Sequence, residues 1–167
     1  NMQQKYILIK KPVLDSLCKK RYPLGRQSTR ALCEATFGTR EVLDMAILVS
    51  GGAGYIGSHT CIELLNAGYD VVVADNYYNA SPVVLDRVKQ ITGKDFRFYQ
   101  ADMTKHEDVE KIFAECPDIT AVIQFAAYKA VGESVSKPIE YYYNNLNCTL
   151  VILDVMRKHN CHNFVFS

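Results

Sequence analysis

A glycine-rich segment near residue 50 limits what this chain can fold into more than any other feature. The segment Gly51–Gly57 reads GGAGYIG and satisfies GxGxxG from Gly52. It follows the apolar run Ala46–Ser50 and precedes Tyr55–Asn66, where apolar residues recur at helical spacing. Such glycines allow a tight turn and let backbone N–H groups and a helix N-terminus approach a diphosphate. The segment predicts a strand–turn–helix unit that binds a dinucleotide, the alternative being a turn needed only for strand–helix packing.

Apolar runs and helical patterns alternate along the rest of the chain. We expect strands at Ala46–Ser50, Val71–Ala74, Phe96–Tyr99, Ala121–Phe125 and Phe164–Phe166, and helices at Tyr55–Asn66, Pro82–Ile91, Thr104–Glu115 and Pro138–Lys158. This alternation predicts an α/β fold, a doubly wound parallel sheet of the Rossmann type with strand order 3-2-1-4-5. Ligands of such sheets bind at the carboxyl ends of the strands, where the strand order reverses. We expect the sheet to be truncated after about five strands.

Two aspartates follow predicted strands. Asp75 lies eighteen residues after Gly57, where an acidic side chain is expected to accept hydrogen bonds from the ribose hydroxyls of a dinucleotide. Its charge would repel a 2′-phosphate, so the sequence favours NAD over NADP as cofactor. Asp102 ends the third predicted strand and could meet the adenine ring. Each could instead be only a turn or cap residue.

Residues 1–44 differ in character from the rest. They carry nine Lys or Arg against four Asp or Glu, whereas residues 45–167 carry ten against fourteen. They show no sustained helix or strand pattern. We expect a basic N-terminal extension that is disordered or not native, and a partial dinucleotide-binding domain at 45–167. A targeting presequence is the alternative for 1–44.

Composition excludes several other classes of protein. No apolar run is long enough to span a bilayer, and no signal-peptide core is present, so we expect a cytoplasmic protein with no membrane partner. The six cysteines lie far apart, which argues against a disulfide framework. His159, Cys161 and His162 are close in sequence, but they lack the spacing of a zinc site, so we expect no metal. No stacking platform for nucleic acid is expected either, because the tyrosines at 141–143 point around a helix axis.

Four segments resemble the UDP-glucose 4-epimerases, a family of extended short-chain dehydrogenase/reductases: Ser50–Cys61, Ala74–Asn79, Phe125–Pro138 and Tyr141–Thr149. The KAVGES stretch followed by KP is the most specific part. Together with the glycine motif, the resemblance implies a set of NAD-binding residues, which are Gly51, Gly54, Tyr55, Ile56, Gly57, Asp75, Asn76, Tyr77, Tyr78, Asn79, Ala80, Asp102, Met103, Phe125, Ala126, Ala127, Tyr128, Lys129 and Asn144. Tyr55 and Ile56 would lie at the diphosphate, and Asp102 and Met103 at the adenine. Cys148 stands where the family usually has glycine.

The resemblance also implies an activity and identifies what the chain lacks. Family members interconvert UDP-glucose and UDP-galactose by NAD-dependent hydride transfer at C4, with a tyrosine of a YxxxK motif as the base. We expect that motif and the sugar-binding domain to lie beyond Ser167, so no catalytic residue is assigned and the chain alone is expected to be inactive. A homodimer is possible for a full-length enzyme. The alternatives are a catalytically inert NAD-binding fragment and a related nucleotide-sugar dehydratase or decarboxylase.

Overall fold

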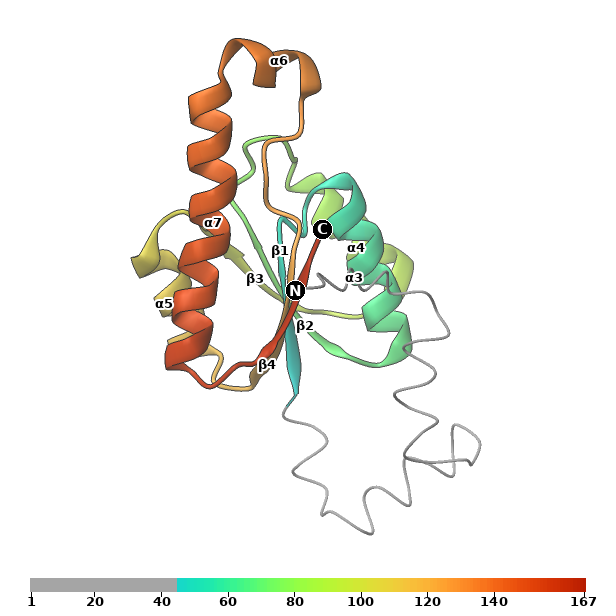
Figure 1. Ribbon diagram of the computed structural model, residues 1–167. Coiled ribbons are helices and arrows are strands. Elements are labelled where there is room, and N and C mark those ends of the chain that lie inside the picture. Colours follow the sequence, from blue (N-terminus) through green and yellow to red (C-terminus); the bar gives the residue numbers. More distant parts are fainter. Residues whose placement is uncertain (1–44) are drawn as a thin grey trace, which may run out of the picture. The chain divides into compact units, whose positions relative to one another are not determined.

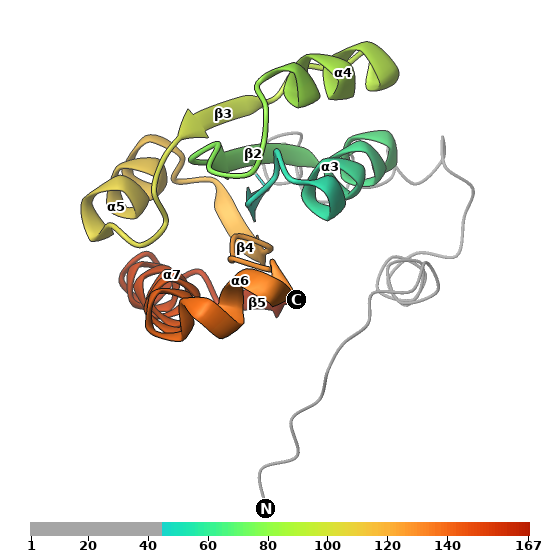
Figure 2. The same ribbon diagram turned by 90° about the horizontal axis from the view of Figure 1, so that it is seen from above.

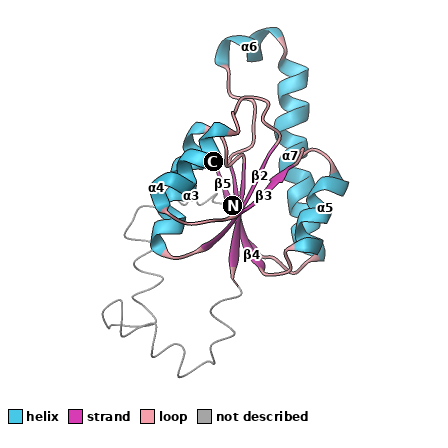
Figure 3. Ribbon diagram, turned by 180° about the vertical axis from the view of Figure 1, so that it is seen from behind, coloured by secondary structure: helices cyan, strands magenta, loops and turns pink. Residues whose placement is uncertain are grey.

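The computed structural model describes residues 45–167 (Figure 1). The expectations for residues 1–44 therefore lie outside the described residues. The strands are β1 (Ala46–Ser50), β2 (Asp70–Asp75), β3 (Arg97–Gln100), β4 (Ile119–Gln124) and β5 (Asn163–Phe166). The helices are α3 (Tyr55–Ala67), α4 (Val83–Thr92), α5 (His106–Glu115), α6 (Val131–Ser136) and α7 (Pro138–Lys158). Strands and helices alternate along the chain, apart from the consecutive pair α6 and α7 (Figure 3).

The strands form one parallel sheet with the order β3-β2-β1-β4-β5. This confirms the predicted doubly wound α/β fold and its strand order. The order reverses between β1 and β4, which pair with Ser50 opposite Gln124 at their carboxyl ends. A ligand site is expected at that reversal.

Helices cover both faces of the sheet, α3 and α4 on one side and α5 and α7 on the other (Figure 2). Consecutive residues of a strand point to opposite faces, so a strand covered on both sides is apolar throughout. In β2, for example, Val72 packs in the core with Ile112 of α5 and Ile152 of α7, whereas Val73 packs in the core with Leu64 of α3. These two cores hold the carboxyl ends of the strands in fixed positions beneath the expected ligand site.

Local details differ from the sequence prediction at two places. Thr104 does not cap α5, because its hydroxyl and its N–H both donate to Asp102 Oδ1, at 2.7 and 3.0 Å, and the helix begins two residues later. The short helix α6 was not predicted. It buries none of its residues, so it carries no apolar periodicity that a sequence pattern could reveal.

Polar contacts join α5 to α7. His106 Nε2 lies 2.9 Å from Asp154 Oδ2, and His159 Nε2 lies 2.7 Å from Glu110 Oε1. The contact with His106, followed by that with Lys158, lowers the pKa of Asp154 to about 2. The ionised form of this carboxyl group is therefore favoured in the folded state.

We expect the contribution of Asp154 to stability to depend on pH. Because its pKa is lower in the folded than in the unfolded chain, the contribution is complete above about pH 4 and disappears as the pH falls towards 2. Thermal unfolding followed by circular dichroism should show an Asp154→Asn variant melting below the wild type at pH 5, with the two melting temperatures converging towards pH 2. A difference that stayed constant down to pH 2 would contradict this assignment.

Candidate functional site

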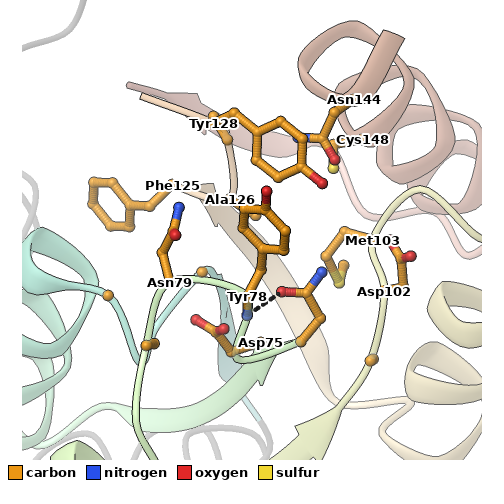
Figure 4. Close-up of a pocket in the computed structure, with 16 residues that line it drawn as sticks. Asp75, Tyr78, Asn79, Asp102, Met103, Phe125, Ala126, Tyr128, Asn144 and Cys148 are labelled. Atoms are coloured by element: carbon orange, nitrogen blue, oxygen red, sulfur yellow. Dashed lines mark hydrogen bonds between the residues drawn. The ribbon is translucent and has the colours of Figure 1, made fainter. Parts of the chain in front are cut away.

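A pocket opens at the carboxyl ends of β1, β2 and β4, at the reversal of strand order (Figure 4). The residues that line it come from the glycine-rich turn, from the segments after β2, β3 and β4, and from α7. They are Gly51, Gly54, Asp75, Asn76, Tyr78, Asn79, Ala80, Ala101, Asp102, Met103, Phe125, Ala126, Ala127, Tyr128, Asn144 and Cys148. The structure thus brings most of the expected site residues together around one pocket.

The glycine-rich turn is packed directly against the segment that follows β4. Gly51 has φ +75°, and a Cβ atom at this position would lie 2.6 Å from the backbone nitrogen of Ala126. A Cβ atom on Gly57 would overlap the carbonyl oxygen of Gly51. The carbonyl oxygen of Ser50 accepts hydrogen bonds from the N–H groups of Phe125 (2.8 Å) and Ala126 (3.1 Å). Only glycine therefore fits at 51 and 57 in this backbone arrangement.

The amino end of α3 begins at this turn. Its N-cap residue is Gly54, which has no side chain to accept from the first-turn N–H groups, and the first turn carries no acidic residue. The first N–H groups of a helix have no partner within the helix, and the helix dipole adds partial positive charge there. This end of α3 can accordingly receive an anion such as a diphosphate.

Asp75 connects the glycine-rich turn to the loop after β2. Its Oδ2 accepts from the N–H of Ala53 at 3.0 Å, and its Oδ1 accepts from the N–H of Tyr77 at 2.8 Å. The side chain is largely buried, with 8% of the residue exposed. Each carboxylate oxygen has a second lone pair, so Asp75 can still accept from a ribose hydroxyl. The bond to Tyr77 is the turn role that the sequence offered as an alternative, whereas the bond to Ala53 of the glycine-rich turn was not indicated by the sequence.

Asp102 and Met103 form the wall of the pocket beyond β3. Asp102 N–H donates to Asp108 Oδ2 at 2.8 Å, and its own carboxylate is engaged by Thr104. Met103 is buried and belongs to the core on the α5 side. Asp102 thus forms a local turn and also borders the pocket. Its position is compatible both with a turn role and with contact to an adenine ring.

The opposite wall is formed after β4 and by α7. Asn145 holds this segment, since its Oδ1 accepts from Tyr128 N–H at 2.8 Å and its Nδ2 donates to Tyr128 O at 3.0 Å. Asn144 lies beside it and donates from Nδ2 to Asn145 Oδ1 at 3.0 Å. Burial of the phenol, followed by the charges of neighbouring groups, raises the pKa of Tyr128. This tyrosine is therefore less suited than an ordinary one to remove a proton at neutral pH.

Five of the expected site residues do not line the pocket, namely Tyr55, Ile56, Gly57, Tyr77 and Lys129. Tyr55 and Ile56 are exposed residues of the first turn of α3, so only their backbone N–H groups are oriented by that helix end. Tyr77 turns away and packs its ring against Phe98. Lys129 is exposed.

Two pocket residues were missing from the expected set, Ala101 and Cys148. Cys148 lies four residues after Asn144 on α7, so helical spacing from Asn144 could have identified it. Burial raises the pKa of its thiol to about 12, and the neutral thiol acts as a small apolar group in the wall. Ala101 directly precedes Asp102 at the end of β3, and its small side chain gave no signal.

Comparison with known proteins points to one family. A sequence model of the NAD dependent epimerase/dehydratase family matches residues 47–167. The chain is 58% identical over 123 residues to UDP-glucose 4-epimerase of Bacillus subtilis and 60% identical over 123 residues to that of Haemophilus influenzae. In both cases the match covers 74% of this chain and 36% of the relative.

A solved structure is similar over the same share of the chain. UDP-glucose 4-epimerase from Bifidobacterium longum, in complex with NAD+ and UDP, matches with a TM-score of 0.72 and 58% sequence identity. The match covers 74% of this chain and 36% of that one. The chain therefore spans little more than a third of the length of these relatives. Within residues 45–167, no helix is both long and apolar enough to cross a lipid bilayer.

Proposed function

Because the chain belongs to the NAD dependent epimerase/dehydratase family, we propose that residues 45–167 bind NAD in the pocket at the carboxyl ends of β1, β2 and β4. We further propose that they provide the cofactor-binding part of an enzyme that interconverts UDP-glucose and UDP-galactose. The 58–60% identity to UDP-glucose 4-epimerases supports this choice of substrate. UDP-glucose and UDP-galactose are accordingly the proposed partners.

One observation carries the cofactor assignment. Gly51 and Gly57 leave no room for a side chain between the turn, α3 and the segment after β4, and the N-cap of α3 leaves its first-turn donors without a side-chain acceptor. A diphosphate is the group that such a cradle of backbone donors fits, and Asp75 borders the same pocket. The residues present therefore suit a dinucleotide with a free 2′-hydroxyl.

The chain's own residues position the cofactor and exclude competing groups. The first turn of α3 would hold the diphosphate, and the remaining lone pairs of Asp75 would hold the adenosine ribose. The segment Phe125–Tyr128 would border the nicotinamide side, as the resemblance implies. Bound here, the cofactor would supply the hydride acceptor for the sugar C4 in its oxidised form and the hydride donor for the opposite face in its reduced form.

The proton acceptor of the reaction is the part that residues 45–167 do not offer. None of their tyrosines is followed by lysine four residues later, and the pKa of Tyr128 is raised. We therefore propose that residues 45–167 bind the cofactor but do not epimerise UDP-hexoses by themselves. Measurable epimerisation in a coupled assay on the purified 167-residue chain, free of host enzyme, would show that a base has been missed.

Isothermal titration of the 167-residue chain with NAD tests the cofactor assignment directly. We expect saturable binding with one site per chain, and a negative heat-capacity change as apolar pocket surface is buried. Absence of binding in a chain whose circular dichroism spectrum shows the folded α/β state would overturn the proposal.

A further inference from the structure

Two tyrosine rings meet across the pocket. Tyr78 comes from the loop after β2, and Tyr128 comes from the segment after β4. Their ring centroids are 4.6 Å apart and their planes are inclined by 30°. Figure 4 shows the two rings side by side, each attached to the backbone of a different wall of the pocket. The pair therefore spans the reversal of strand order, with β1 between the two strands that carry it.

An uncommon backbone conformation delivers Tyr78 to this position. Tyr77 has φ +61°, a region that non-glycine residues seldom adopt. Its N–H donates to Asp75 Oδ1, and its ring packs against Phe98 with a centroid separation of 5.3 Å. Since Tyr77 is turned towards the core on the α4 side, the next side chain, Tyr78, is directed to the pocket and stays 56% exposed. The hydrogen bond to Asp75 and the ring contact with Phe98 thus hold Tyr77 in this strained backbone conformation.

Tyr128 is the fixed partner of the pair. Its N–H and carbonyl groups are both held by the Asn145 side chain, and its ring meets the Tyr141 ring in an edge-to-face arrangement with the centroids 5.4 Å apart. Within residues 45–167, no hydrogen bond holds the Tyr78 phenol group, and the loop is held instead by the hydrogen bond from the Tyr78 backbone N–H to Asn76 Oδ1 at 3.0 Å. Tyr78 is therefore the ring that can swing away while Tyr128 stays in place.

We propose that Tyr78 and Tyr128 form an aromatic clasp that must open for a dinucleotide to enter or leave the pocket. The inference rests on the proposed NAD binding, because a dinucleotide that reaches from Asp75 to Tyr128 passes between the two walls that the rings connect. Aromatic pairs at such centroid distances are stabilised beyond the area they bury, so the closed state is favoured. A gate slows entry and release alike, whereas a direct contact with the ligand slows release alone.

Stopped-flow measurement of NAD association and displacement on the 167-residue chain tests the clasp. We expect Tyr78→Ala to accelerate both rates by about two- to tenfold, the range that measured aromatic pair energies imply. Tyr128→Leu, which removes the ring from the other wall, should accelerate both rates similarly. Tyr78→Phe retains a ring and should recover most of the slow kinetics. Tyr142→Ala, which removes an exposed tyrosine of α7 outside the pocket, is the matched control and should leave both rates unchanged.

Near-ultraviolet circular dichroism gives a second readout. The chain contains no tryptophan, so its tyrosines dominate this spectrum. We expect Tyr78→Ala and Tyr128→Leu to remove the same component of the spectrum and Tyr142→Ala to retain it. Wild-type rates in both ring-deleting variants, or faster release with unchanged association, would overturn the clasp and leave the NAD assignment standing. A wild-type chain that bound no NAD would overturn the proposed function and the clasp's role together.

Discussion

Gly51→Ala is expected to abolish most dinucleotide binding and to lower the free energy of unfolding by about 2–4 kcal/mol. The positive φ of Gly51 is unfavourable for alanine, and the added Cβ would lie 2.6 Å from the nitrogen and 2.8 Å from the Cα of Ala126. These are backbone atoms held by hydrogen bonds to Ser50, so they cannot move aside without displacing the pocket wall. Titration with NAD and urea unfolding of the same variant measure the two effects.

Gly93→Ala is the matched control for this experiment. Gly93 also has a positive φ, +63°, but nothing lies within 4 Å of a Cβ atom built there. We expect it to lose about 1 kcal/mol of stability from backbone strain and none of its NAD affinity. If Gly51→Ala bound NAD as tightly as Gly93→Ala, the close packing of the turn against Ala126 would have no role in cofactor binding.

Asp75→Ala is expected to reduce both the preference for NAD over NADP and the stability of the fold. The wild-type chain should favour NAD by about tenfold or more, because a buried carboxylate repels the 2′-phosphate of NADP. The N–H groups of Ala53 and Tyr77 would lose their acceptor, which we expect to lower the free energy of unfolding by about 2–4 kcal/mol. Parallel titrations with NAD and NADP, and urea unfolding, measure these changes.

Two further variants complete the experiment, one that separates charge from structure at position 75 and one that is a control outside the pocket. Asp75→Asn removes the charge but keeps one acceptor oxygen. It should therefore reduce the preference for NAD over NADP with a smaller loss of stability than Asp75→Ala. Asp95→Ala removes an exposed aspartate that pairs with Lys89 outside the pocket. It should change neither the preference for NAD over NADP nor the affinity for NAD. Equal wild-type affinity for NAD and NADP would contradict the assignment of Asp75 to the ribose.

Much of the fold and of the candidate site could be predicted from local sequence. The strand Ala46–Ser50 and the helix Pro138–Lys158 were predicted with the bounds that the structure shows, because apolar runs, glycines and a proline at the helix start are local signals. The pocket followed from these elements, since the carboxyl ends of parallel strands meet at one edge. This is why Gly51 and Asp75, which are distant in sequence, were expected in one site, whereas Asn144 of α7 was expected there only because of the resemblance to the UDP-glucose 4-epimerases.

Contacts between distant segments were decided only by the tertiary structure. The hydrogen bond from Ala53 to Asp75 and the ring contact between Tyr78 and Tyr128 join residues that are 22 and 50 positions apart, and no local pattern encodes them. They depend on the twist of the sheet, on the turn at Tyr77 and on which rotamers the packed walls allow. The sequence therefore indicated most of the residues that surround the pocket. Packing determined which of them contact one another and how the two walls of the pocket meet.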